Sequence, residues 1–262
     1  MFYYYGRRKQ IAHRYPSPQY THIIEPFAGS AAYSMYWAEQ GIEREVTLID
    51  KSEVVAIIWK YLLSAKETDI KNLPKLKTGD TLDDYQQLSK AEKFLIGFHI
   101  NPGSAVPKLT VSKASRWEAG RKYIIKTLPL VRHWKFIHGD YFDADATFAT
   151  WFIDPPFQCG GSHYQHQIND YNVLGDWVKS RCGQVIVCEA EPATWLPFRD
   201  LGSTVNNGGL NSAKRRKDLI WTGESDGWQP LSAPKPKVKR AQYLVEVDYS
   251  PPLPSKLFER LK

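Results

Sequence analysis

Short apolar runs rich in β-branched residues recur along the chain, and each ends in a polar or Gly/Pro-rich turn. Such runs are typical of strands in a parallel sheet that is buried on both faces. Several are separated by stretches of helical character, an alternation that predicts a doubly wound α/β sheet. The predicted strands are His22–Glu25, Val46–Asp50, Phe136–Gly139, Thr150–Asp154 and Gln184–Cys188, and the predicted helices are Ala31–Gln40, Ser52–Ser64 and Tyr171–Arg181.

This alternation is interrupted between residues 65 and 135. The segment contains charged helical stretches around an irregular turn at Asn101-Pro102-Gly103, and we predict an inserted, mainly helical recognition subdomain there. A Pro-rich, basic tail with one predicted strand at Tyr243–Val247 begins near residue 223. The predicted division is therefore 1–64 and 136–222 for the two parts of the core, 65–135 for the insertion and 223–262 for the extension.

Acidic residues fall at the carboxyl ends of four predicted strands, where open α/β sheets bind their ligands. Glu25, Asp50, Asp140 and Asp154 are therefore expected to line one crevice. Asp50 stands where a carboxylate commonly holds ribose hydroxyls. Asp140, which precedes Tyr141, is suited to accept a hydrogen bond from an adenine amino group.

The first predicted strand runs into a turn of small residues, Glu25-Pro26-Phe27-Ala28-Gly29-Ser30-Ala31. Small residues let a cofactor lie directly against the backbone. Turns of this kind occur in many α/β proteins, so this motif alone does not decide the function.

The most specific motif is Asp154-Pro155-Pro156-Phe157, which closes an apolar strand with an acid, two prolines and an aromatic ring. The prolines fix the backbone, so the carboxylate and the ring are held in one rigid arc. An exocyclic amine is a poor nucleophile. A carboxylate and the Pro155 carbonyl that accept its two hydrogens would localise its lone pair. Phe157 would stack on a base that has been flipped out of the duplex.

Composition limits the class of protein. Lys and Arg number 35 against 28 Asp and Glu, which gives a formal net charge of +7 and favours polyanionic partners. The three cysteines form no even disulfide framework, and no long apolar run predicts a leader or a membrane span. We expect a cytoplasmic, monomeric protein with a single catalytic unit.

Basic side chains in two segments are candidate phosphate contacts. They are Arg116, Arg121 and Lys122 in the insertion, and the run Lys214, Arg215, Arg216 and Lys217, which is expected to form a loop before a strand at Asp218–Thr222. A charge run is also typical of an ordinary solvated face. The spacing of Cys159, His163 and His166 matches no common zinc pattern, so no metal is assigned.

Taken together, these motifs resemble the D12 class of adenine-N6 DNA methyltransferases, the Dam-like group, and especially its phage-type members. The resemblance runs from Tyr5 to about Thr222 and follows the class in its motif order. It implies a Rossmann-like class I methyltransferase fold, S-adenosylmethionine as cofactor, double-stranded DNA as substrate, and a phage or restriction-modification setting. By similarity, the cofactor would contact Tyr5, Gly6 and Arg8 near the N-terminus, Phe27 and Gly29 at the methionine side, Asp50 at the ribose and Asp140 at the adenine. Glu25 and Tyr141 are expected as further cofactor contacts.

The chain departs from the class at three places. The class usually has Gly-Gly-Lys or Gly-Ser-Lys where this chain has Gly6-Arg7-Arg8, a second glycine where Ala31 stands, and Tyr where Phe157 stands. Arg keeps the charge, Ala is nearly as small as Gly, and Phe keeps the ring face that stacking needs. We therefore expect an active enzyme.

Two alternatives remain open at this point. The same carboxylate chemistry suits N4 of cytosine, although Ser-Pro-Pro is commoner there. A C5-cytosine mechanism lacks its Pro-Cys nucleophile. A degenerate DNA-binding module of the same fold is the alternative outside enzymes, and titration of the cofactor separates it from an enzyme.

Overall fold

The computed structural model describes residues 1–4, 6, 10–161, 164–205 and 215–225, with only the backbone at the ends of the last two strands. Residues 1–228 form one compact unit. The expected tail strand Tyr243–Val247 and most of the predicted 223–262 extension lie outside the described residues.

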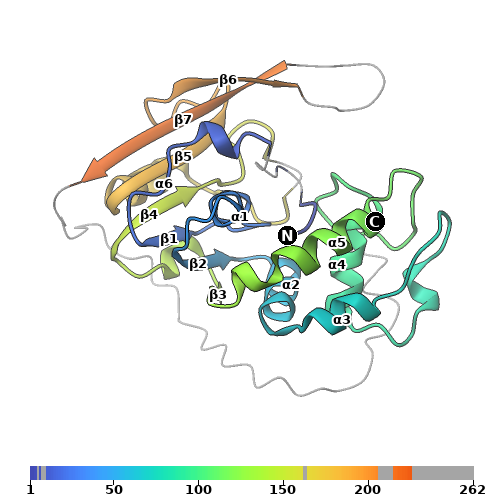
Figure 1. Cartoon of the computed structure of the whole chain (residues 1–262). Helices are drawn as coiled ribbons and strands as arrows, with labels where there is room; N and C mark the ends of the chain where they lie inside the picture. Colours follow the sequence, from blue (N-terminus) through green and yellow to red (C-terminus); the bar gives the residue numbers. More distant parts are fainter. Residues whose placement is uncertain (5, 7–9, 162–163, 206–214, 226–262) are drawn as a thin grey trace. The chain divides into compact units, whose positions relative to one another are not determined.

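Seven described strands form one sheet in the order β3-β2-β1-β4-β5-β7-β6 (Figure 1). Strands β1 to β5 pair with one another in parallel, whereas β7 runs antiparallel between β5 and β6. The chain order reverses at the β1–β4 pair, the position at which doubly wound sheets bind ligands. The bounds are β1 His22–Glu25, β2 Glu45–Asp50, β3 Lys135–His138, β4 Phe148–Ile153, β5 Cys182–Ala190, β6 Arg199–Val205 and β7 Arg215–Ser225.

The predicted architecture, a Rossmann-like doubly wound α/β sheet with a mainly helical insertion, is confirmed. The apolar runs became the five parallel strands because a sheet covered on both faces buries every side chain of its central strands. All nine residues of β5 are buried. The hydrophobic core contains several aromatic rings, among them Trp151, Trp177 and Tyr141.

Helices flank the sheet close to where the sequence predicts them. They are α1 (Ala32–Glu39), α2 (Glu53–Ser64) and α6 (Tyr171–Lys179). The Ser52 side chain accepts a hydrogen bond from the Val55 N–H at the start of α2, and Asp170 does the same for the Asn172 N–H at the start of α6. No described helix is long and apolar enough to cross a membrane.

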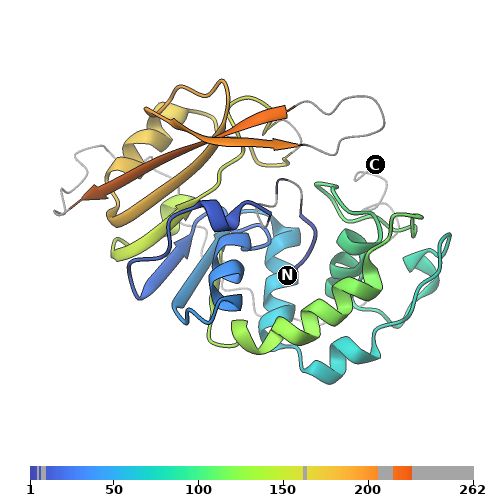
Figure 2. The ribbon, with the colours of Figure 1, turned by 45° about the horizontal axis from the view of Figure 1, so that its top comes forward.

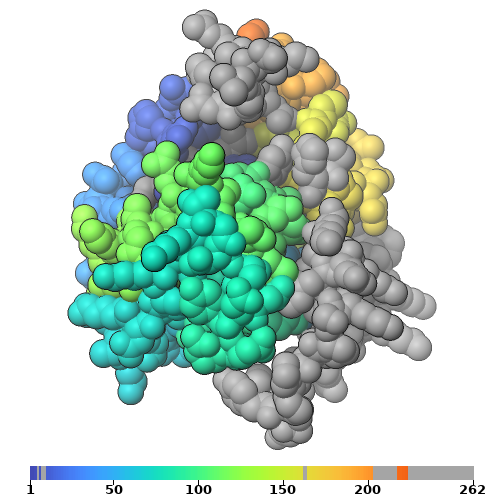
Figure 3. Space-filling view, turned by 90° about the vertical axis from the view of Figure 1, so that its right-hand side faces the viewer, coloured from blue at the N-terminus to red at the C-terminus, as the bar shows by residue number. Residues whose placement is uncertain are grey.

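The inserted segment contains three helices, α3 (Glu67–Asn72), α4 (Lys90–Ile100) and α5 (Trp117–Thr127). Helix α4 packs against α2 and helix α5 against α3. The three helices lie beside α2, on the side away from β6 and β7, and the arrowheads of β2 and β4 point toward that side (Figures 1 and 2). The surface of the insertion and that of the segment after β4, in yellow, lie on one face (Figure 3).

Two sequence-based boundaries are wrong. Residues 215–217 do not form a loop, because they pair with residues 203–205 of β6 as the first part of β7. The core does not end at residue 222, since β7 continues to Ser225. Strand β6 itself was not predicted.

Candidate active site

The turn after β1 is tied to the end of β2 by backbone hydrogen bonds. The Ala28 N–H donates to the Ile49 carbonyl at 3.0 Å, and the Gly29 N–H donates to Asp50 Oδ2 at 2.8 Å. The Gly29 carbonyl accepts from the Trp59 indole at 2.8 Å. The backbone of this turn is therefore held from both sides.

Two residues of this turn adopt left-handed conformations, Gly29 at φ 46° and Ala31 at φ 51°. A side chain at Gly29 would press against the ring of Tyr4, because its Cβ would lie 3.0 Å from Cδ1 of that ring. Ala31, fully buried at the start of α1, takes a conformation in which glycine is less strained.

Asp50 lies at the end of β2 and accepts two backbone hydrogen bonds. One comes from Gly29, and the other goes from the Ser52 N–H to Oδ1 at 2.9 Å. Burial raises the pKa of the Asp50 carboxyl, while these two hydrogen bonds act in the opposite direction. A carboxylate offers about four lone-pair positions, so Asp50 keeps acceptor capacity for a ligand hydroxyl.

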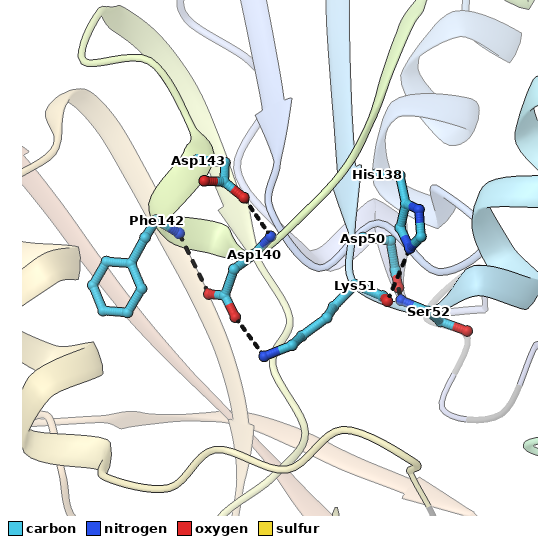
Figure 4. Close-up of polar contacts among 7 residues, drawn as sticks. All are labelled: Asp50, Lys51, Ser52, His138, Asp140, Phe142 and Asp143. Atoms are coloured by element: carbon cyan, nitrogen blue, oxygen red, sulfur yellow. Dashed lines mark hydrogen bonds and ion pairs between the residues drawn. The ribbon is translucent and has the colours of Figure 1, made fainter. Parts of the chain in front are cut away.

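Asp140 follows β3 and begins the short 3₁₀ helix η4 (Tyr141–Asp143). Its Oδ1 accepts from the Phe142 N–H at 3.5 Å, and its own N–H donates to Asp143 Oδ2 at 2.8 Å (Figure 4). Its Oδ2 lies 2.9 Å from the ammonium of Lys51. Asp140 therefore stands in a fixed position beside Asp50 at the carboxyl edge of the sheet.

Tyr141, predicted as a cofactor contact, belongs to the core. It is 8% exposed, and its ring centroid lies 4.9 Å from that of Trp177 and 5.3 Å from that of Phe27. Burial raises the pKa of its phenol. The Tyr141 ring packs against Phe27. Tyr141 would therefore affect a ligand only indirectly, by holding the Phe27 ring in position.

Glu25, which was expected to line the crevice, is instead buried between the end of β1 and α1. Its Oε1 accepts from the Ser34 N–H at 2.8 Å, and the residue is only 2% exposed. Burial raises the pKa of the Glu25 carboxyl to about 7, and the negative charge of Asp154 contributes to that rise. The effect of Asp154 follows from the pairing of β1 with β4, which brings the two carboxyl groups to neighbouring strand ends.

The Asp154-Pro155-Pro156-Phe157 segment leaves β4 and is held by hydrogen bonds from three directions. The Tyr171 hydroxyl donates to the Pro156 carbonyl at 2.7 Å, and the Gly161 N–H donates to the Phe157 carbonyl at 3.1 Å. The Gln158 N–H donates to Glu189 Oε1, on the fully buried Glu189 of β5, at 2.7 Å. Within the described part of the chain, no donor contacts the Pro155 carbonyl. Asp154 and Phe157 remain partly exposed.

The N-terminal residues fall partly outside the described structure. Tyr5 and Arg8 lie outside it, whereas Gly6 is described and adopts φ 73°. A Cβ at Gly6 would collide with the hydroxyl of Tyr164, which lies in the segment after β4. Among the described residues, the ring of Tyr4 lies against Gly29.

The predicted DNA contacts differ in whether their side chains are exposed or form contacts within the protein. Arg116 and Lys122 are exposed. Lys217 pairs with Glu191, with Nζ 3.7 Å from Oε1. Lys214 lies outside the described residues, as do the side chains of Arg215 and Arg216.

Arg121 is not available as a phosphate contact, which corrects the sequence-based assignment. Its guanidinium donates to the carbonyls of Lys71 and Leu73 at 3.1 and 3.0 Å, at the end of α3, and to Glu118 Oε2 at 2.9 Å. Its side chain is 14% exposed. Charge along the sequence does not distinguish such a helix-capping arginine from one that faces solvent.

Arg121→Met is therefore expected to lower the free energy of unfolding by about 1–3 kcal/mol, because carbonyls at the end of α3 lose a charged donor. Lys122→Met, at the exposed neighbouring position, is expected to change it by no more than about 0.5 kcal/mol. Urea unfolding of both variants measures the difference. If both variants are equally stable and only the Arg121 variant loses affinity for DNA, Arg121 contacts DNA and does not cap α3.

Four residues of the site were not predicted from the sequence: Tyr4, Lys51, Tyr171 and Glu189. Each acts through a contact with a distant segment. An aromatic run at positions 2–5 and a lysine after a strand carry no local signal for such contacts. Among the described residues, no group of three or more His, Cys, Asp or Glu side chains is placed to hold a metal ion.

No known family's sequence profile matches the chain, and no curated protein matches it either. Among solved structures it is similar to a conserved hypothetical protein from Streptococcus pyogenes, with 10% identity, TM-score 0.35 and coverage of 78% of this chain and 86% of the other. It is also similar to the rRNA methyltransferase aviRa from Streptomyces viridochromogenes, with 13% identity, TM-score 0.38 and coverage of 82% and 81%. A third is the glycopeptide N-methyltransferase MtfA complexed with S-adenosylmethionine, with 15% identity, TM-score 0.33 and coverage of 85% and 68%. Likenesses of this extent do not establish a substrate.

Proposed function

We propose that this chain is an S-adenosylmethionine-dependent methyltransferase that methylates N6 of adenine in duplex DNA. The observation that carries the proposal is the rigid Asp154-Pro155-Pro156-Phe157 segment at the carboxyl end of β4, next to the β1 turn at the point where strand order reverses. A ligand-binding crevice is expected at that point of a doubly wound sheet.

The residues present fit the proposed cofactor. The β1 turn presents backbone without a side chain at Gly29, and acceptor carboxylates stand at the ends of the next two strands, Asp50 and Asp140. Phe27 and Gly29 would hold the methionine part, Asp50 the ribose and Asp140 the adenine. When bound, the cofactor supplies a methyl group on a sulfonium, which is electrophilic without a metal.

The chain's own residues prepare the nucleophile. Asp154 and the Pro155 carbonyl accept the two hydrogens of the target amine, so that its lone pair is directed out of the ring system. The Pro156 carbonyl already accepts from Tyr171 and thereby fixes the segment. The amine nitrogen would take the methyl group as the sulfonium's bond to that carbon breaks and leaves a neutral thioether. The nitrogen would then carry the positive charge, which the adjacent carboxylate stabilises until a proton leaves the nitrogen for solvent.

Phe157 provides the stacking surface for the target base. Phe157→Ala is expected to lower kcat/KM for DNA by about 10- to 100-fold, in line with a stacking contribution of about 1–3 kcal/mol per base, and to leave cofactor affinity unchanged. Phe157→Tyr keeps the ring face and should retain activity. Steady-state rates with a calorimetric cofactor titration separate the two effects. Loss of cofactor affinity with intact DNA turnover would place the ring in the cofactor pocket.

Duplex DNA as substrate is supported by the net charge of +7 and by the exposed Arg116 and Lys122 on the insertion, which lies on the same face as the segment after β4 (Figure 3). The direct test is transfer of a labelled methyl group to duplex DNA, to RNA and to a protein mixture. We expect label in duplex DNA. Label in RNA or protein alone would refute the proposed substrate, and cofactor binding without transfer to any of them would favour the degenerate module.

A further inference from the structure

An ion pair joins the carboxyl ends of β2 and β3. Lys51, the first residue after β2, places its ammonium 2.9 Å from Oδ2 of Asp140 (Figure 4). The two side chains are 58% and 32% exposed. An exposed pair of this kind contributes little to stability, so stability does not account for its position.

The backbone that carries Lys51 is fixed on both sides. The Ser52 N–H donates to Asp50 Oδ1 at 2.9 Å, and the Lys51 carbonyl lies 3.2 Å from Nε2 of His138. Figure 4 shows Lys51 extending from this anchored turn toward Asp140. The ammonium therefore occupies a defined place beside the carboxylate.

The arrangement pairs a donor with an acceptor at adjacent positions. Lys51 presents only donors, and an ionised Asp140 presents only acceptors. The Watson–Crick edge of adenine has the opposite pattern, with a donor at the N6 amino group next to an acceptor at ring N1. The backbone N–H of Phe142, another donor beside Asp140, faces Oδ1 at 3.5 Å.

We infer that Lys51 is a specificity residue for the adenine ring of the cofactor, donating to N1 while Asp140 accepts from N6. This inference rests on the proposed function, since it concerns the nucleoside end of that site. Hypoxanthine carries an acceptor and a donor in the reverse order, so the pair would select against a deaminated cofactor.

A third segment lies near the same position. The pKa of His166, in the segment between β4 and α6, is lowered first by burial and then by the positive charge of Lys51, whereas Asp140 acts in the opposite direction. His138 also lowers it. Charges from the ends of β2 and β3 therefore act on His166, which indicates that the segment after β4 passes close to the Lys51–Asp140 pair.

The test is a chemical double-mutant cycle on cofactor binding, which needs no turnover. Calorimetry measures the affinity of the wild type and of Lys51→Met for S-adenosylhomocysteine and for its 1-deaza analogue, in which ring N1 is a C–H. Lys90→Met is the matched control, because Lys90 forms a comparable exposed ion pair with Glu53 at 3.0 Å. Thermal melts confirm that the variants are folded.

The wild type and the Lys90 variant are expected to bind the 1-deaza analogue about 10-fold or more weakly than S-adenosylhomocysteine, since a charged donor loses its acceptor. Lys51→Met is expected to bind both compounds equally, with the wild type's affinity for the analogue. A Lys51 variant that keeps the 10-fold preference, or a wild type without one, would overturn the inference while leaving the cofactor in place. A folded wild type that binds neither compound would instead refute the proposed function, and the inference with it.

Discussion

Asp154→Asn is expected to lower the rate of methyl transfer by about 10²–10³-fold, with cofactor affinity unchanged. The amide keeps one oxygen acceptor, but it loses the negative charge that stabilises the nitrogen as that atom becomes positive. Asp154 is partly exposed at a strand end, so the substitution removes little buried surface. Methyl incorporation from labelled cofactor measures the loss.

A failure of the Asp154 variant to fold would also abolish methyl transfer, and two controls exclude this cause. Asp145→Asn removes an exposed carboxylate between β3 and β4 and should keep full activity. A thermal melt of the Asp154 variant should lie at or above that of the wild type, because the Asp154 charge is one of the factors that raise the pKa of Glu25. Near-normal turnover in the folded Asp154 variant would rule out its assigned role.

Glu25→Gln is expected to change how stability depends on pH. The pKa of the Glu25 carboxyl is raised from 4.5 to about 7 in the folded protein. Its stabilising contribution is therefore complete below about pH 4.5 and is lost as pH rises through 7, when a buried group must ionise. The full change corresponds to about 3 kcal/mol.

Urea unfolding of the wild type and of Glu25→Gln at pH 5, 6, 7 and 8 measures this contribution. The variant, which cannot ionise, is expected to gain stability relative to the wild type by about 2–3 kcal/mol between pH 5 and pH 8. Glu43→Gln, at an exposed position between α1 and β2, reports the effect of losing one charge alone. Parallel curves for the wild type and Glu25→Gln would mean that Glu25 ionises as easily in the fold as outside it.

The parallel strands and their flanking helices were predictable because their signals are local. Strand β1 was predicted with both ends correct, and Ser52 marked the start of α2 by its capping side chain. Strand β5 extends two residues beyond the prediction at each end, where Cys182, Gly183, Glu189 and Ala190 lack the β-branched signal but pair with β4 or β7. Strand β6 was missed because its hydrogen-bonding partner, not its own pattern, makes it a strand.

The site was predictable to the same extent. Glu25, Asp50 and Asp154 stand at the strand ends where the sequence places them. The sequence did not predict what each charge contacts. The guanidinium of Arg121 is directed inward to the end of α3, and the ammonium of Lys51 reaches Asp140, 89 positions further along the chain. Such pairings depend on the packing of whole elements, so they appear only in the folded structure.

The most direct test of the central claim is the nucleoside composition of duplex DNA after incubation with the protein and S-adenosylmethionine. Enzymatic digestion followed by mass spectrometry distinguishes the methylated bases. The account predicts N6-methyladenine, formed by the wild type and absent with Asp154→Asn. N4-methylcytosine in its place, or N6-methyladenine formed equally by the Asp154 variant, would contradict it.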